Sequence, residues 1–338
     1  MINNKFFHIL VLDGGNYHSM YEAMFHDLNK LNNCLLLIDK SKDTFIKRIL
    51  LKEKVRKVVG TSMDILVSDK NELEKYIAMY SCRYQWLSVI FLNSAFYFKT
   101  YLPKTLKAYK EKYKNIKYSL VYLDIMNSGV SRAANNLVKN NIFDYIFTID
   151  KNDALKNGFD LITTPYSYID SNDDSSKYID LYFCGALKSR SDILLQISAN
   201  CQKNKILGKF DVIKDNSNQD DLINDIKLLS PKSFIPYNQQ VKNVMKTNCI
   251  LELVEPGQAA LTLRAYEAVV YNKKLLTNNP SIFSFKFYNP KLVQYFNDPK
   301  LIDYKWIREE TDEKYNYHNE FSPVHLLNVI EEKILNEE

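Results

Sequence analysis

Three polar side chains mark the start of a predicted helix in the C-terminal half of this 338-residue chain: Thr262, Arg264 and Glu267. They follow a strand-like run at 249–254 and a loop that contains Gly257. The free N–H groups of a first helical turn, together with the positive end of the helix dipole, attract phosphate. Arg264 can grip a diphosphate with its planar guanidinium, and Glu267 can accept hydrogen bonds from ribose hydroxyls. The same spacing fits an amphipathic helix on whose surface Arg264 and Glu267 form an ion pair.

Short apolar runs alternate with helix-period segments along most of the chain, which is the pattern of βαβ units around a parallel sheet. A polar stretch at 170–177 has no apolar period and is typical of an interdomain linker. We therefore expect an α/β chain with a Rossmann-like domain at 1–170, a second at 178–320, and a C-terminal helix in 321–338 that packs back on the first domain. The segment 73–113 is expected to be helical, with one break. The predicted strands are 8–12, 35–39, 119–124, 145–150, 179–184, 210–213, 249–254 and 274–277.

Two blocks of sequence carry a family resemblance. The first runs over 255–268 and continues at 272–279, and the second runs over 121–128 and continues at 143–154. The blocks lie in different halves of the chain and in the expected order. Together they resemble bacterial lipopolysaccharide-core and capsular-polysaccharide glycosyltransferases of the GT-B type.

The resemblance implies a GT-B-like fold, in which two Rossmann-like domains have parallel sheets facing across a cleft. It places a nucleotide-diphosphate-sugar donor in the C-terminal half and the acceptor in the N-terminal half. This sequence has Ala259 and Ala260 where the family pattern leads us to expect a glycine. Glu252 lies inside the strand, and because a buried carboxylate needs a partner we expect it to pair with a basic residue. The donor-binding residues of the first block are Glu255, Gln258, Thr262, Arg264 and Glu267, with Glu255 placed to touch the sugar.

A basic turn, containing Gly185, Lys188 and Arg190, follows the predicted strand at 179–184. A basic residue at such a turn commonly neutralises the donor phosphates in GT-B enzymes, so the resemblance gives this role to Lys188 or Arg190. Gly185 would allow the backbone to approach the ligand closely. The alternative is a solvated basic turn in which Ser191 caps the next helix.

Polar residues also follow strands of the N-terminal half, where the resemblance puts the acceptor. Asp13 and two glycines come directly after the run at 8–12, and His18 follows shortly after them. The glycines leave space for a ligand, and Asp13 or His18 can remove a proton from an acceptor hydroxyl if the reaction inverts configuration. Asp124, at the end of another strand, is a rival base, and it can equally be an N-cap or a ribose contact. A Gly-Gly pair also makes simple turns, and a histidine near a helix start is commonly a cap or a surface residue.

Other classes of chemistry lack their signals in this sequence. The formal net charge of +5 is too small to indicate nucleic-acid binding. The five cysteines are widely spaced, odd in number and without a C-x-x-C pair, which favours a reducing compartment over a disulfide framework or a zinc site. No Asp-x-Asp tripeptide occurs and the five histidines do not cluster. We therefore expect no metal, and no cofactor apart from the nucleotide-sugar co-substrate.

A lysine-rich stretch, Lys99–Lys117, interleaves lysines with aromatic residues. This composition is typical of a helix that leans on an anionic bilayer, and a solvated lysine-rich helix is the alternative. The most apolar stretch, 86–98, is shorter than the roughly 20 residues that span a membrane. We expect a cytoplasmic protein, either soluble or peripheral on the inner face of the cytoplasmic membrane.

These expectations converge on a metal-independent glycosyltransferase, of hexosyltransferase type, acting in lipopolysaccharide or capsular-polysaccharide biosynthesis. It would transfer a sugar from a nucleotide-diphosphate-sugar donor to a glycan or lipid-linked glycan acceptor. Two alternatives use the same frame: a sugar-nucleotide epimerase, and a non-catalytic nucleotide-sugar-binding subunit of a polysaccharide assembly complex. An epimerase would change a UDP-sugar without any acceptor, whereas a binding subunit would bind the donor without turnover.

Overall fold

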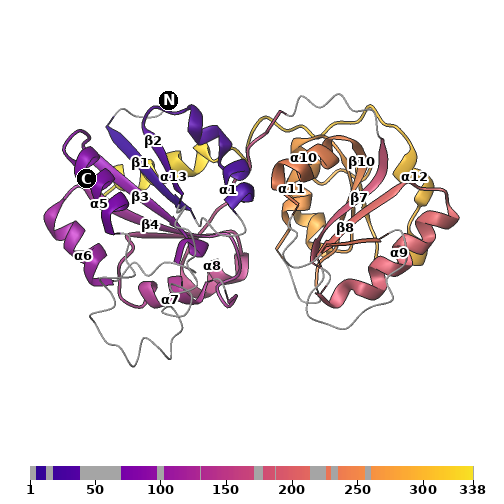
Figure 1. Ribbon diagram of the computed structural model, residues 1–338, viewed down its shortest axis with the longest axis horizontal. Coiled ribbons are helices and arrows are strands. Elements are labelled where there is room, and N and C mark those ends of the chain that lie inside the picture. The colour runs from indigo at the N-terminus through magenta and orange to yellow at the C-terminus, as the bar shows by residue number, and fades with distance from the viewer. Residues whose placement is uncertain are drawn as a thin grey trace. The chain divides into compact units, whose positions relative to one another are not determined.

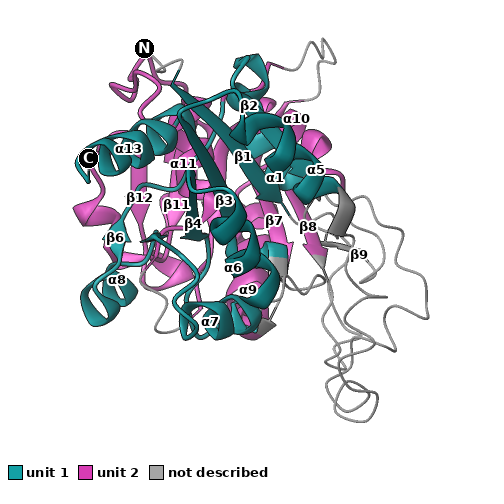
Figure 2. Ribbon diagram, turned by 90° about the vertical axis from the view of Figure 1, so that its left-hand side faces the viewer, with its two compact units in different colours: residues 1–167, 322–338 teal, residues 168–321 magenta. Residues whose placement is uncertain are grey.

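The computed structural model describes residues 5–12, 18–38, 70–96, 103–129, 131–170, 178–186, 188–213, 226–229, 235–255 and 260–337. The chain divides into two compact units, shown in teal and magenta in Figure 2. Unit 1 comprises Met1–Ser167 and Ser322–Glu338, and unit 2 comprises Tyr168–Phe321. Each unit is built on its own parallel sheet of six strands.

The sheet of unit 1 has the order β2-β1-β3-β4-β5-β6, and every pair in it is parallel. Its central strands are apolar along nearly their whole length and buried on both faces, as expected for a parallel sheet covered by helices. The strands are β1 (Phe6–Leu12), β2 (Cys34–Ile38), β3 (Trp86–Leu92), β4 (Ile116–Tyr122), β5 (Tyr145–Thr148) and β6 (Asp160–Leu161).

Helices connect the strands of this sheet and cover its faces (Figure 1). They are α1 (His18–Met24), α5 (Lys70–Ser81), α6 (Pro103–Lys112), α7 (Arg132–Val138), α8 (Lys151–Asn157) and α13 (Val324–Leu335), with short 3-10 turns η1 (His26–Lys30) and η3 (Asn93–Phe96). The last of them, α13, returns to unit 1 from the far end of the chain. It buries Leu326, Leu327, Ile330 and Ile334, and Ser322 just before it donates a 2.8 Å hydrogen bond to Asp27 Oδ2.

The sheet of unit 2 has the order β12-β11-β10-β7-β8-β9, again with parallel pairs throughout. Numbered from its first strand, this is the Rossmann order 3-2-1-4-5-6, which reverses direction between the first and fourth strands. Those two strands are β7 and β10. The strands are β7 (Ile179–Ala186), β8 (Gly208–Ile213), β9 (Ile226–Leu229), β10 (Thr247–Glu252), β11 (Lys274–Thr277) and β12 (Val293–Tyr295).

Alternate side chains of these strands point to opposite faces of the sheet. Leu181, Phe183, Cys249 and Leu251 pack in an apolar cluster with residues of α9 and α12. Tyr182 instead shares a hydrogen bond with Asn243 of α10, so the opposite face of the sheet meets α10 and carries polar groups. The helices of unit 2 are α9 (Ser191–Lys203), α10 (Tyr237–Met245), α11 (Leu263–Val270) and α12 (Tyr304–Arg308), with 3-10 turns η4 (Lys188–Arg190), η5 (Pro280–Ser284) and η6 (Pro299–Leu301).

The predicted architecture, an α/β chain with two Rossmann-like parallel sheets, is confirmed. One sequence-based assignment is wrong: the segment 73–113 is not a broken helix, because the fully paired strand β3 lies between α5 and α6. Its sequence is apolar at nearly every position, so it shows neither the period of a strand nor that of a helix. Within the residues described, no helix combines the length and the hydropathy needed to cross a membrane.

Candidate functional site

Most of the predicted donor-binding residues lie at the carboxyl edge of the unit 2 sheet, just beyond the ends of β7 and β10. The strand order reverses between these two strands, and ligands of open α/β sheets bind at such a switch point. The chain leaves β10 at Glu252 and returns at Thr262 to begin α11. Gln258 lies outside the described residues, as does the rest of the connection at 256–259.

The first turn of α11 is capped from two sides. The Thr262 hydroxyl accepts a hydrogen bond from the backbone N–H of Arg264 at 3.2 Å, which is the N-cap arrangement. The backbone N–H of Thr262 itself donates to Glu252 Oε1 at 2.7 Å, and the Thr277 hydroxyl donates to Glu252 Oε2 at 2.6 Å. Glu252 is fully buried, and the expected basic partner acts on it only through charge, since Arg264 opposes the rise in its pKa without a hydrogen bond to it among the described residues. Its hydrogen-bond partners are a backbone amide and a hydroxyl.

The ends of the connection between β10 and α11 are held by two asparagines that follow β11. Asn278 Oδ1 accepts a hydrogen bond from the backbone N–H of Val254 at 2.8 Å, and Asn279 Nδ2 donates to the carbonyl of Ala260 at 3.1 Å. Asn279 also accepts from the N–H of Ser281 at 3.0 Å, which caps η5. Sequence reasoning gave these asparagines no role, although the first matching block ends on them.

Arg264 and Glu267 do form the ion pair that their spacing allows, and the pair is buried instead of lying on the surface. The Arg264 side chain is 12% exposed and that of Glu267 is inaccessible. Arg264 Nη1 donates to Glu267 Oε2, and Nη2 donates to Gln240 Oε1 of α10 at 3.1 Å. The hydroxyl of Tyr237, also on α10, donates to the remaining oxygen of Glu267. Each carboxylate oxygen already accepts one hydrogen bond, and because the Glu267 side chain is inaccessible, a ribose hydroxyl could reach it only if the surrounding side chains moved.

Burial and ion pairing act in opposite directions on these groups. Burial is the largest single influence on the pKa of Arg264 and lowers it, but the Glu267 carboxylate and the acidic side chains of Cys184, Tyr237 and Tyr182 together hold the pKa above its ordinary value. Burial raises the pKa of Glu267, while Arg264 and Tyr237 oppose that rise. Burial also raises the pKa of Glu252, against the hydrogen bonds from Thr277 and Thr262. Arg264 is thus a permanent cation in a layer of low dielectric.

Arg190, in the turn after β7, lies against the ends of both central strands. Its two Nη atoms donate to the carbonyls of Ala186 at the end of β7 and Leu253 just beyond β10. Burial lowers the pKa of Arg190, and the nearby Glu255 carboxylate opposes that change. Its Nε–H is buried and finds no acceptor among the residues that the structure describes. A buried cationic donor without a partner is unusual and favours an anionic ligand.

Fewer contacts are described for the other predicted donor-binding residues, Gly185, Lys188 and Glu255. Gly185 is the penultimate residue of β7, and a Cβ there would come 3.3 Å from the Phe183 ring, so the position is tight. Lys188 begins η4, and its side chain lies outside the described part of the structure. Glu255 is partly buried at the exit from β10. Arg190 and Glu255 are thus brought together, whereas the roles assigned to Gly185 and Lys188 stay predictions.

The side chains of two of the three candidate bases of unit 1, Asp13 and His18, lie outside the described part of the structure, so the structure does not show whether the three lie together. Asp13 lies outside the described residues, and His18 is described only as the first residue of α1. Asp124 is exposed just after β4, and its Oδ1 accepts from the N–H of Ile125 at 2.8 Å, so it caps its own turn. The loop that carries Asp124 is held by Asn93, which accepts from the N–H of Leu123 at 3.1 Å. Their assignment as catalytic bases stays a prediction.

The lysine-rich stretch is described from residue 103 onward, and it does not behave as one surface. Lys110 forms an ion pair with Asp144 at 2.6 Å and Lys117 one with Glu337 at 2.6 Å, so these two lysines serve contacts within unit 1. Tyr109, counted among the aromatic residues of the stretch, is buried in the core. The exposed lysines of the described part are Lys104, Lys107, Lys112 and Lys114.

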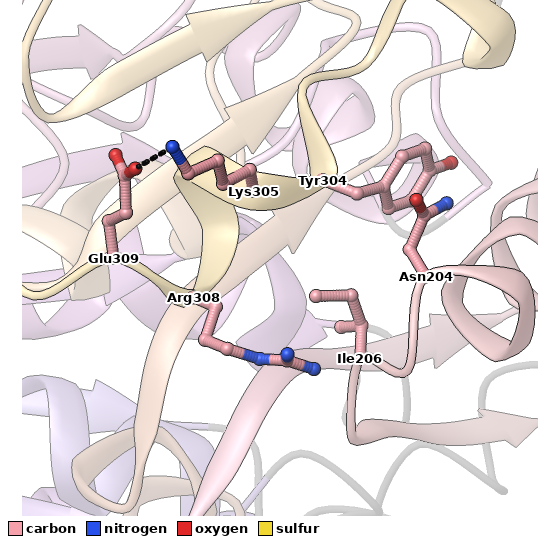
Figure 3. A pocket seen from close by; sticks show the side chains of 6 residues that line it. All are labelled: Asn204, Ile206, Tyr304, Lys305, Arg308 and Glu309. Atoms are coloured by element: carbon pink, nitrogen blue, oxygen red, sulfur yellow. Dashed lines mark ion pairs between the residues drawn. The ribbon is translucent and has the colours of Figure 1, made fainter.

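A hollow of about 420 Å³ lies at the opposite edge of the unit 2 sheet, where the strands begin. Figure 3 shows Arg308 extending into it towards Ile206, with Lys305 and Glu309 together on the far rim. Each cation there has a carboxylate beside it: Arg308 Nε lies 3.7 Å from Asp180 Oδ2, and Lys305 Nζ lies 3.4 Å from Glu309 Oε1. Both cations of this hollow therefore already have a carboxylate nearby.

No family model matches the sequence, and no curated protein matches it. Among solved structures, the chain is similar to TarM, with 13% identity and a TM-score of 0.37 over 74% of this chain and 53% of TarM, about half its length. It is also similar to the glycotransferase of kitacinnamycin, with 8% identity and a TM-score of 0.42 over 98% of this chain and 99% of that one. A third is an alpha-glucosyltransferase in complex with UDP and a 13-mer DNA, with 11% identity and a TM-score of 0.48 over 87% and 83%. The likeness to all three concerns the fold alone.

The described geometry defines a class of site. Unit 2 is a Rossmann-like α/β unit whose switch point carries a capped helix start, a buried arginine on α11 and a second arginine after β7. Arg190 bonds the carbonyl of Ala186 at the end of β7, and the charge of Arg264 opposes the rise that burial causes in the pKa of the Cys184 thiol on the same strand. Such an arrangement suits a ligand that carries a pyrophosphate.

Proposed function

We propose that the chain is a glycosyltransferase that uses a nucleotide-diphosphate-sugar donor. The observation that carries the proposal is the convergence of Arg190, Arg264 and the start of α11 at the switch point of the unit 2 sheet. Charge develops on the diphosphate as the glycosidic bond to the donor sugar breaks. Fixed cations and the positive end of a helix dipole stabilise that charge best when they are already in place in a water-poor site.

Arg190 supplies the most direct part of this site. Its buried Nε–H lacks an acceptor among the described residues, and a phosphate oxygen would provide one. The Arg190 guanidinium is held by two backbone carbonyls, which carry no net charge. In this proposal Arg264 and the positive end of the α11 dipole complete the binding of the diphosphate, because the N–H groups of Thr262, Arg264 and Ala265 already have acceptors.

The finer parts of the proposal rest on the sequence. The blocks at 255–279 and 121–154 resemble lipopolysaccharide-core and capsular-polysaccharide enzymes, so the acceptor is proposed to be a growing surface glycan that binds at unit 1. Asp13, His18 and Asp124 stay the candidate bases. Hexosyl transfer without a metal ion is proposed because the sequence has no Asp-x-Asp tripeptide and no cluster of histidines.

Donor binding can be measured before the acceptor is known. We expect UDP or another nucleoside diphosphate, and its sugar conjugate, to raise the melting temperature of the purified protein, because a ligand of the folded state stabilises it. Arg190→Gln should remove most of that rise, and Arg308→Gln should not, because Arg308 lies at the opposite edge of the same sheet. Addition of EDTA should change neither the binding nor any slow hydrolysis of the donor.

Arg264 needs a different variant, because its partner is buried. Arg264→Ala would leave the Glu267 carboxylate without a counter-charge in the interior, which costs about 3–5 kcal/mol and risks unfolding. Arg264→Lys keeps the charge and loses the planar fork, so it tests the grip on the diphosphate. A wild-type protein that binds no nucleotide or nucleotide sugar would contradict the proposal, as would an Arg190→Gln variant that binds as well as the wild type.

A further inference from the structure

The side of Arg264 that faces α10 is held by a chain of hydrogen bonds that begins on that helix. Tyr237 and Gln240 lie one turn apart on α10, and both are buried there. The Tyr237 hydroxyl donates to Glu267 Oε1, which leaves Oε2 to accept from Arg264 Nη1. Gln240 Oε1 accepts from Arg264 Nη2 at 3.1 Å. Both terminal nitrogens of the guanidinium are therefore fixed.

The orientation of the Gln240 amide is itself determined. Its Nε2 donates to the carbonyl of Ile235 at 3.0 Å, so its oxygen is the end that faces Arg264. A flipped amide would set two carbonyl oxygens against each other and an NH₂ group against a guanidinium. Tyr237 is similarly restricted, because a phenol beside a carboxylate donates its proton. These hydrogen bonds together restrict the rotation of the Arg264 plane.

We propose that Tyr237 and Gln240 are positioning residues, which fix the orientation of the Arg264 guanidinium for the donor diphosphate. This inference rests on the proposed function. A guanidinium binds a diphosphate through N–H groups at fixed angles, so its plane matters as much as its charge. A long side chain that is already immobilised also loses less conformational entropy when the ligand binds. In this arrangement Glu267 acts through Arg264 and does not need to touch the ribose.

The test uses Tyr237→Phe and Gln240→Met, which remove one hydrogen bond each and keep nearly the same volume. Tyr304→Phe is the matched control, because it removes a buried tyrosine hydroxyl of the same unit that donates to the carbonyl of Pro299 at the opposite edge. The dissociation constant for UDP, or for whichever nucleoside diphosphate the wild type binds best, is measured by calorimetry. We expect a rise of about fivefold to thirtyfold for each α10 variant and none for the control.

A double-mutant cycle separates positioning from a general loss of stability. If Tyr237 and Gln240 act through Arg264, their substitutions should have little further effect on binding once Arg264→Lys has removed the planar fork. An equal effect in both backgrounds would overturn the inference, and so would α10 variants that bind like the wild type while Arg264→Lys binds weakly. In either of those outcomes the proposed function would stand. A wild type that binds no nucleotide would instead overturn the proposed function, and the inference with it.

Discussion

His8, in the middle of the first strand, and Glu331, in the last helix, share a buried hydrogen bond of 2.9 Å across 323 residues of sequence. The His8 side chain is inaccessible and that of Glu331 is 8% exposed. The bond ties α13 to the centre of the unit 1 sheet, and the helix also buries four apolar side chains, Leu326, Leu327, Ile330 and Ile334. A polar pair in such surroundings specifies where the helix docks, because an unpaired partner would be costly there.

Glu331→Ala should therefore destabilise unit 1 more than an ordinary helix substitution does. The change leaves the His8 ring without its partner in the core, which costs about 1–3 kcal/mol. Glu337→Ala is the matched control, because Glu337 also pairs with a strand residue, Lys117, but is half exposed, so its loss should cost less than about 1 kcal/mol. The free energies of unfolding are measured in urea. Equal losses for the two variants would show that the buried bond has no special weight.

The connection between β10 and α11 should depend on Asn279. Asn279→Ala removes the hydrogen bond to the carbonyl of Ala260 and the cap of η5. We expect the affinity for the nucleotide to fall about fivefold, because the loop end that precedes α11 is no longer fixed. Asn289→Ala is a suitable control, since that side chain also accepts a backbone N–H two residues ahead, on an exposed turn. If both variants bind the nucleotide like the wild type, the loop does not need this support.

Thr262 offers a separate test of the helix start. Thr262→Val keeps the shape of the side chain and removes the oxygen that accepts from the N–H of Arg264. The loss of an N-cap costs about 0.5–2 kcal/mol, which thermal unfolding can detect. Thr262→Ser retains the oxygen and should restore both stability and nucleotide binding. If the Ser and Val variants behave alike, the cap contributes nothing to the site.

The sequence predicted the layers of this protein better than its buried polar contacts. Alternating apolar runs were sufficient for two parallel sheets, because strands covered on both faces need apolar residues at nearly every position. The same property concealed β3, whose residues are apolar without a period. Strand pairing had to decide its conformation, and the pairing of β3 with β1 and β4 involves residues far from it in the chain.

The candidate site shows a similar limit. The spacing of Arg264 and Glu267 indicated that they are neighbours on a helix, but spacing alone does not tell which side of a short helix faces the sheet. Their partners Tyr237 and Gln240 come from a different helix, 24 to 30 residues earlier. Hydrophobic periodicity carries no signal for such a contact between polar side chains. The buried character of the ion pair therefore became visible only in the structure.

The pH dependence of stability should reveal the buried state of Glu252. Burial raises the pKa of this carboxyl group in the folded protein above the value in the unfolded chain, so the folded state binds its proton more tightly. The stabilisation is present in full below the ordinary glutamate pKa, and it is lost as the pH rises through the raised value.

The variant Glu252→Gln tests this pH dependence, because its side chain does not titrate and can still accept a hydrogen bond from the N–H of Thr262. The free energy of unfolding of the variant, relative to that of the wild type, should therefore increase as the pH rises above the ordinary glutamate pKa of about 4.3. Glu267, whose pKa burial also raises, is present in both proteins and cancels from the comparison. Parallel curves over this range would mean that Glu252 titrates alike in the folded and unfolded chains.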